Sequence, residues 1–233
     1  MNELTHIISA ADIEACEKPH CQRSLLLETI AVTVAALAII RFLHASLIGI
    51  SWLLIPCTLV AAAMAPTWAA ARDFPRVGLH ADPIRRAVRT VALASLCVLP
   101  PVYLGLWLLT AFGLPMPLCP VLPPRQGQAA WLLYQFLYVA AAEEVFFRGY
   151  LLTNATRVLG TDRASHTWIA IAISAACFAL AHVVVQGQIA SALTFLPGLL
   201  LGWLFVRTRC LLAPILFHGL ANVSYGIMAT TLG

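Results

Sequence analysis

The stretch AAEEVFFRGY, residues 141–150, places two adjacent carboxylates and an arginine inside a long run of apolar side chains. The rest of the chain makes this unusual, because 61% of its 233 residues are hydrophobic and only 10% are charged. An ordinary soluble domain carries about 25% charged residues. So few polar side chains cannot cover a surface that faces water, and the composition therefore indicates an integral membrane protein.

Seven apolar runs of about 18–25 residues follow one another, the length at which a helix crosses about 30 Å of hydrocarbon. The runs lie near 25–43, 47–70, 90–112, 129–152, 166–185, 189–206 and 211–231. They are continuous rather than alternating, which argues against a transmembrane barrel. The sequence therefore predicts an all-α, polytopic membrane helix bundle of about seven transmembrane helices. A polar tail (1–24) would precede a single transmembrane domain (25–233).

Three connections between the runs have a recognisable composition. Residues 71–89 are basic and contain Asp82-Pro83, a pair suited to a helix start, so we expect a short interfacial helix before the third span. Residues 113–128 hold five prolines and should form an extended outer loop. The polar residues 186–188 predict an outer hairpin.

The distribution of basic residues predicts the orientation in the membrane. With a cytoplasmic N-terminus, twelve of the fourteen Lys and Arg residues fall in or next to inner segments, a clear positive-inside pattern. Arginine greatly outnumbers lysine and alanine is abundant, which suggests a bacterial genome of high GC content. We therefore expect a multi-pass protein of the bacterial cytoplasmic (inner) membrane. No basic run suggests a nucleic-acid partner.

Glu143 and Glu144 lie deep in the fourth apolar run, where an ionisable residue costs about 2.5–3.5 kcal/mol on insertion scales. Such residues are usually functional, although an internal salt bridge that fixes helix packing is the alternative. Glu144 and Arg148 are four residues apart on one helix face and can pair. Glu143 has Phe147 at the corresponding position, so its carboxylate needs a partner from another helix.

Two histidines lie inside or at the end of later apolar runs. His182 ends the segment FALAH (178–182), and His218 begins HGLAN (218–222), which places Asn222 on the same helix face and Gly219 at a position of close approach. Each histidine could be no more than a hydrogen-bonding group between helices. Together with Glu143, these residues suit water activation with an oxyanion site, or a metal site of Glu and His ligands.

The motifs EEVFFR, FALAH and HGLAN, in this order on successive apolar segments, resemble those of the CAAX-protease and bacteriocin-processing (Abi) family of intramembrane endopeptidases. The family pattern is E-E-x-x-x-R, then F-x-x-x-H, then H-x-x-x-N or D, and no position of it is missing. The resemblance covers about residues 70–225. It implies an all-helical, glutamate-dependent endopeptidase that cuts near the C-terminus of a membrane-embedded or lipid-anchored protein or peptide.

The resemblance also assigns roles. Glu143 and His182 would activate water, and His218 and Asn222 would stabilise the oxyanion. Glu144 and Arg148 would support the site.

No cofactor is expected, with zinc as the alternative, in which Glu143, His182 and His218 would be the ligands. Three other functions stay open: a metal-dependent membrane protease, a non-catalytic immunity or scaffold protein of the same fold, and a carrier or channel with a proton relay. The carrier is disfavoured because the sequence shows no inverted repeat. The absence of H-E-x-x-H lowers the case for zinc. The sequence does not indicate the oligomeric state.

Overall fold

The computed structural model describes residues 19–47, 49–75, 81–118, 122–160 and 163–232, and within them it contains helices and no strand. Six of these helices are long and apolar enough to cross a membrane. They are α2 (Pro19–Ser46), α3 (Ser51–Ala69), α4 (Ala81–Ala111), α8 (Ala164–Gln186), α9 (Phe195–Thr208, preceded by the 3₁₀ helix η3, Ile189–Thr194) and α10 (Leu212–Leu232). The predicted all-α membrane bundle is confirmed.

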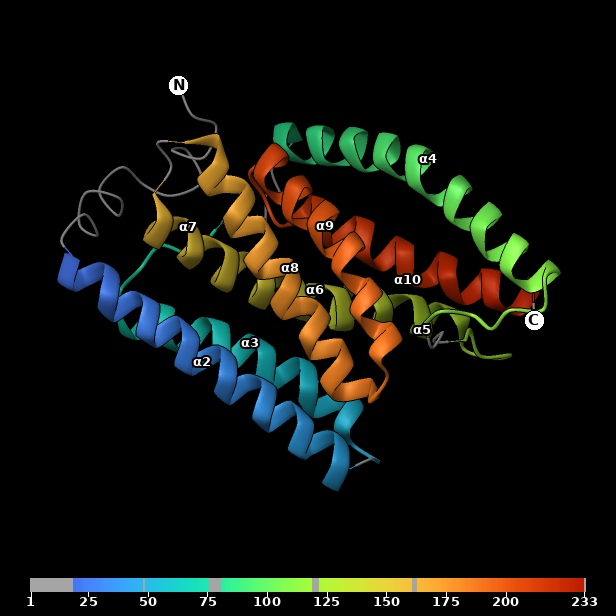
Figure 1. Ribbon diagram of the computed structural model, residues 1–233, viewed down its shortest axis with the longest axis horizontal. Coiled ribbons are helices and arrows are strands. Elements are labelled where there is room, and N and C mark those ends of the chain that lie inside the picture. The colour runs from blue at the N-terminus through green and yellow to red at the C-terminus, as the bar shows by residue number, and fades with distance from the viewer. Residues whose placement is uncertain (1–18, 48, 76–80, 119–121, 161–162, 233) are drawn as a thin grey trace.

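The predicted fourth span forms a helical rod that runs from Gln128 to Leu159 and alternates between α and π geometry (Figure 1). Its segments are α5 (Gln128–Leu133), η1 (Tyr134–Ala140), α6 (Ala141–Glu144), η2 (Val145–Leu152) and α7 (Thr153–Leu159). The junction residues keep right-handed helical dihedrals, so the chain never leaves the rod. We call this rod the central helix, because it contacts α3, α8 and α10. π turns inside helices often accompany functional sites.

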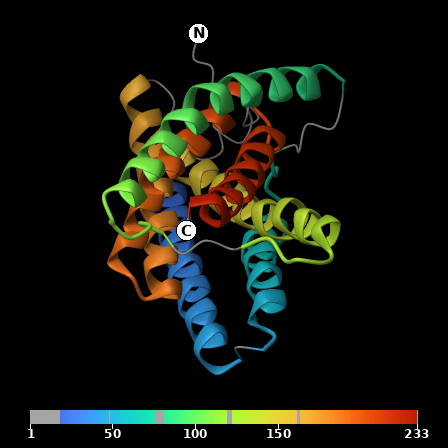
Figure 2. The ribbon, with the colours of Figure 1, turned by 90° about the vertical axis from the view of Figure 1, so that its right-hand side faces the viewer.

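The other helices surround the central helix on two sides. Figure 2 shows α2 and α3 paired on one side, and α4 on the other side, lying along α10. In Figure 1, α8 crosses in front of the central helix, and α9 runs next to α8. The middle of the central helix, where the two glutamates lie, is therefore enclosed by helices that are distant in sequence.

The expected interfacial helix is not a separate element. Ala81 to Ala111 is one helix of 31 residues that continues directly into the third span. Pro83 lies in the first turn, where its missing N–H costs nothing, and no glycine or proline follows before Pro100, so nothing ends the helix at the membrane surface. Residues 76–80, in the expected basic segment, lie outside the described residues.

The tail and the hairpins fit the remaining expectations in part. Residues 1–18 of the predicted tail lie outside the described residues, and α2 already begins at Pro19. The predicted hairpin is present, because α8 ends at Gln186 and Gly187 follows with a left-handed φ of 68°, a conformation that favours glycine; its position on the outer side stays a prediction.

Small residues let the helices that carry the site approach closely. A Cβ atom on Gly219 of α10 would lie 2.4 Å from the Phe136 ring of η1, so this position accepts only glycine without rearrangement. A Cβ on Gly198 of α9 would lie 3.1 Å from that of Ala175 of α8. Such close contacts of small residues are typical of helix packing in membranes. They confirm the predicted close approach at Gly219.

Candidate active site

A buried ion pair forms the centre of the polar cluster. Arg148 donates from one terminal nitrogen to Oε1 of Glu144 at 2.8 Å, and neither side chain is exposed to solvent. The predicted pair at i, i+4 is therefore present. Its position inside the bundle means that each charge depends on the other for neutralisation.

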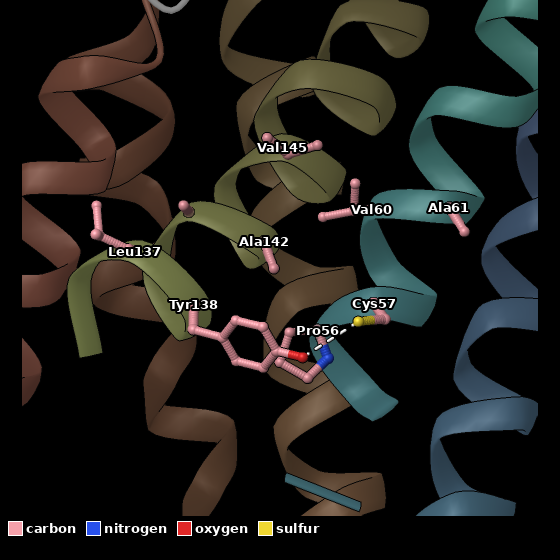
Figure 3. Close-up of a pocket in the computed structure, with 9 residues that line it drawn as sticks. Pro56, Cys57, Val60, Ala61, Leu137, Tyr138, Ala142 and Val145 are labelled. Carbon is pink, nitrogen blue, oxygen red and sulfur yellow. Dashed lines mark hydrogen bonds between the residues drawn. The ribbon is translucent and has the colours of Figure 1, made fainter. Parts of the chain in front are cut away.

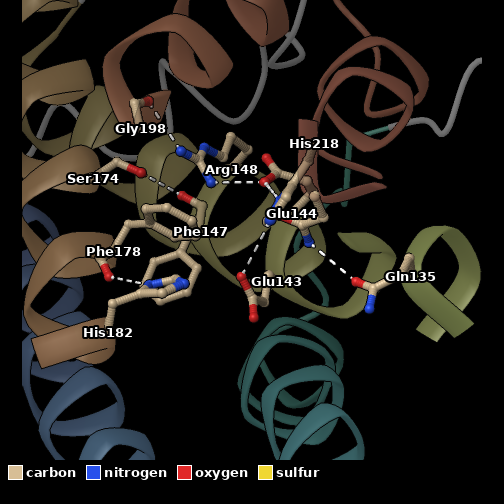
Figure 4. A network of polar contacts seen from close by, with 11 residues as sticks. Gln135, Glu143, Glu144, Phe147, Arg148, Ser174, Phe178, His182, Gly198 and His218 are labelled. Atoms are coloured by element: carbon tan, nitrogen blue, oxygen red, sulfur yellow. Dashed lines mark hydrogen bonds and ion pairs between the residues drawn. The ribbon is translucent and has the colours of Figure 1, made fainter. Parts of the chain in front are cut away.

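Arg148 also connects the central helix to α8 and α9. Its second terminal nitrogen donates to the carbonyl oxygen of Gly198 at 3.0 Å, and its guanidinium lies 4.8 Å from the centre of the Phe178 ring (Figure 4). The close packing of Gly198 against α8 brings this carbonyl into reach. One side chain thus holds three helices in register around Glu144.

His218 lies between the two glutamates. Its Nδ1 is 2.7 Å from Oε1 of Glu144, and its Nε2 is 3.7 Å from Oε2 of Glu143. A carboxylate accepts, so Nδ1 donates to Glu144 and the Nε2 edge is turned toward Glu143. Glu143 thus has the partner from another helix that its sequence context requires, although at a longer distance than a hydrogen bond.

His182 belongs to the same cluster through the Phe178 ring. That ring lies 4.5 Å from the His182 ring and 5.7 Å from the His218 ring, measured between centres. Nδ1 of His182 is 3.0 Å from the carbonyl oxygen of Phe178, which can only accept, so Nδ1 carries a proton. In the neutral ring Nε2 then holds the lone pair and is free to accept a proton.

Glu143 is the most accessible member of the carboxylate pair, with 18% of its side chain exposed, against none for Glu144. In Figure 4 the His182 ring lies on the same side of the cluster as the Glu143 carboxylate. No direct hydrogen bond joins the two in the described structure. Two side chains that both bind one water molecule need no direct hydrogen bond to each other.

Asn222 makes a contact that the sequence did not predict. Its Nδ2 donates to Oε1 of Gln135, in η1, at 3.4 Å. Gln135 is almost fully buried, with 1% exposure. A polar side chain inside the run WLLYQFLYVAA (131–141) is a signal of the same kind as the glutamates, and the intramembrane argument applied to it would have identified this residue.

The six candidate residues are thus brought together from three helices. Glu143, Glu144 and Arg148 come from the central helix, His182 from α8, and His218 and Asn222 from α10. Within the part of the chain that the structure describes, no group of three His, Cys, Asp or Glu side chains is arranged to hold a metal ion. The expectation of a metal-free reaction stays a prediction.

A groove opens beside the cluster, between α3 and the central helix (Figure 3). It has a volume of about 380 Å³ and is lined by Pro56, Cys57, Val60, Ala61, Leu137, Tyr138, Ala141, Ala142 and Val145. At one end the Tyr138 hydroxyl donates to the carbonyl of Leu53 at 2.5 Å and lies 3.1 Å from Sγ of Cys57. The groove wall includes Ala142, so an apolar chain bound there would lie next to the segment that carries Glu143.

Residues 125–224 match the model of a family described as type II CAAX prenyl endopeptidase Rce1-like, and this segment contains all six candidate residues. No curated protein and no solved structure matches the chain. The predicted resemblance is confirmed over residues 125–224, where this multi-pass membrane protein is similar to the Rce1-like type II CAAX prenyl endopeptidases.

Proposed function

We propose that the protein is a glutamate-dependent intramembrane endopeptidase that cleaves near the C-terminus of a membrane-anchored or lipidated protein or peptide. The observation that carries this proposal is the His218 ring held between Glu143 and Glu144. One carboxylate is fully buried and neutralised by Arg148, while the other is partly accessible and lacks a cation on its own helix. This division between a supporting and a reactive carboxylate suits general-base catalysis.

In the proposed reaction Glu143 is the base. It takes one proton from water. Nε2 of His182 accepts a hydrogen bond from the other O–H of that water and so orients the lone pair of the water oxygen. The water oxygen attacks the scissile carbonyl carbon and forms a tetrahedral intermediate. Glu143 then returns its proton to the departing amine, the C–N bond breaks, and a new carboxylate and a new amine are released.

His218 and Asn222 stabilise the negative charge on the carbonyl oxygen. To donate from Nε2, His218 must carry a proton on both nitrogens, and the Glu144 carboxylate accepts the one on Nδ1. Arg148 pairs with the Glu144 carboxylate and so neutralises its charge in an environment without water. In this account Glu144 and Arg148 hold His218 in place and do not touch the substrate.

The groove between α3 and the central helix supports access from the lipid. Its lining is largely apolar, and it reaches Ala141 and Ala142, directly before the reactive glutamate in sequence. A lipid chain or an apolar segment of the substrate can be accommodated there without leaving the hydrocarbon. We further propose that the N-terminus is cytoplasmic, in the inner membrane of a bacterium, as the basic residues indicate, and that the reaction needs no metal.

The test uses the purified chain in liposomes with two probes: a farnesylated peptide that carries a fluorophore and a quencher around its last four residues, and a peptide with one membrane-spanning segment. We expect a single cut in at least one probe, and one ¹⁸O atom in the new carboxylate when the reaction runs in H₂¹⁸O.

Variants of two histidines provide the control. His218→Ala should abolish cleavage, whereas His44→Ala, at the end of α2 and outside the cluster, should leave it unchanged. If the wild-type chain cuts neither probe, or if His218→Ala remains active, the proposal is wrong, and a non-catalytic role of the same fold replaces it.

A further inference from the structure

The buried amide of Gln135 has a hydrogen-bond donor without a partner. The side chain is 1% exposed, its Oε1 accepts from Asn222, and its Nε2 makes no hydrogen bond. Leaving a buried donor unpaired costs free energy, so such groups are rare unless they have a functional purpose. Gln135 lies outside the three motifs, two turns before Glu143 on the central helix.

The geometry around Gln135 fixes where this donor lies. Asn222 holds the amide oxygen, so the NH₂ group is directed away from Asn222. Directly beside Gln135, the ring of Phe136 packs against Gly219, which leaves little freedom between η1 and α10. The amide is therefore positioned before any substrate binds, as an electrostatic catalytic group must be.

The polar atoms left unpaired around the cluster have complementary chemistry. Oε2 of Glu143 and Oε2 of Glu144 are acceptors, which suit the hydrogens of water. The donors are Nε2 of Gln135 and Nε of Arg148. The Arg148 guanidinium already contacts Glu144, the Gly198 carbonyl and the Phe178 ring, which leaves Nε2 of Gln135, on the amide that binds Asn222, as the uncommitted donor of these two.

We propose that Gln135 is a further catalytic residue, whose Nε2 donates to the scissile carbonyl oxygen of the substrate as it becomes negatively charged. Its Oε1 at the same time orients Asn222, so the two amides act as a pair. This inference rests on the proposed proteolytic function. It adds an oxyanion donor from the central helix to those that α10 supplies.

The experiment compares Gln135→Met with Gln128→Met in the full chain, purified and placed in liposomes. Both changes replace the same residue on the same helix, but Gln128 is exposed. With the farnesylated peptide as probe, kcat of Gln135→Met should fall about 10²–10³-fold, the loss typical of one oxyanion donor. KM should change less than about twofold, because the contact forms mainly in the transition state. Gln128→Met should resemble the wild type.

Two further readouts separate catalysis from structure. A peptide aldehyde, whose hydrate resembles the tetrahedral intermediate, should bind Gln135→Met more weakly by about the same factor as kcat. The melting temperature should change little, because methionine removes a buried unpaired donor and, with it, only the long 3.4 Å hydrogen bond from the partly buried Asn222.

Unchanged kcat in Gln135→Met, or a loss that follows a lower melting temperature, would overturn the inference while the proteolytic function stands. A wild-type chain that cuts neither the farnesylated nor the membrane-spanning probe contradicts the function itself, and the inference fails with it.

Discussion

Replacing Arg148 with methionine should destabilise the protein strongly, because the structure gives this side chain three buried contacts. The change leaves Glu144 buried with His218 as its remaining partner, and breaking a buried ion pair in this way costs about 3–5 kcal/mol. The carbonyl of Gly198 also loses its charged donor, which adds about 1–3 kcal/mol. Since whole domains are stable by only about 5–15 kcal/mol, the variant should accumulate poorly.

The assay is a double-mutant cycle of Arg148→Met and Glu144→Gln, with thermal or denaturant unfolding in detergent and the amount in membranes as readouts. Because neutralising both members removes the stranded charge, the double variant should regain part of the stability that Arg148→Met loses. It should still lack activity, since His218 has lost the carboxylate that orients it. If Arg148→Met is as stable as the wild type, Arg148 is not the structural support that we infer.

Three other predictions concern packing, topology and the metal. Gly219→Ala should lower stability and activity, because a Cβ there would lie 2.4 Å from an aromatic ring. Gly105→Ala, whose Cβ would meet no atom within 4 Å, should have little effect. Unfolding and cleavage assays of both variants check this. Reporter fusions after Ala71 and after Arg209 should read cytoplasmic and one in the 113–128 loop external, and a reversal at any of them contradicts the orientation. The purified enzyme should keep its activity after chelation, and elemental analysis near one zinc per chain, with activity restored by zinc, would favour the metalloprotease instead.

The convergence of the site residues was predictable from the sequence for a physical reason. Charged groups in hydrocarbon must find partners, so the two adjacent glutamates required polar groups from other spans, and both meet His218. The pairing of Glu144 with Arg148 followed from helix periodicity alone. His182 and His218 were the histidines within apolar runs that had polar company, and the structure brings both to the Phe178 ring.

Other features depend on tertiary packing and left no trace in the periodicity. Straight helices would not place His182, Glu143 and His218 at one depth, and the two π segments that flank the glutamates cannot be read from apolar spacing. Arg148 donates to a backbone carbonyl at Gly198, and because that partner is not a side chain, no sequence motif predicts the contact. The prediction of a separate interfacial helix was wrong, because the sequence contains no residue that ends α4 before Pro100.

The measurement that tests the central claim most directly is the turnover number of purified Glu143→Gln on the cleaved probe, beside its unfolding midpoint. The account predicts that kcat falls at least about 10²–10⁴-fold, the contribution of a general base. It also predicts a nearly unchanged midpoint, because Oε2 of Glu143 makes no hydrogen bond and lies 3.7 Å from Nε2 of His218. Glu28→Gln, a carboxylate of α2 that pairs with Arg72 away from the cluster, should keep its kcat. Full activity in Glu143→Gln would contradict the claim that this carboxylate activates the water.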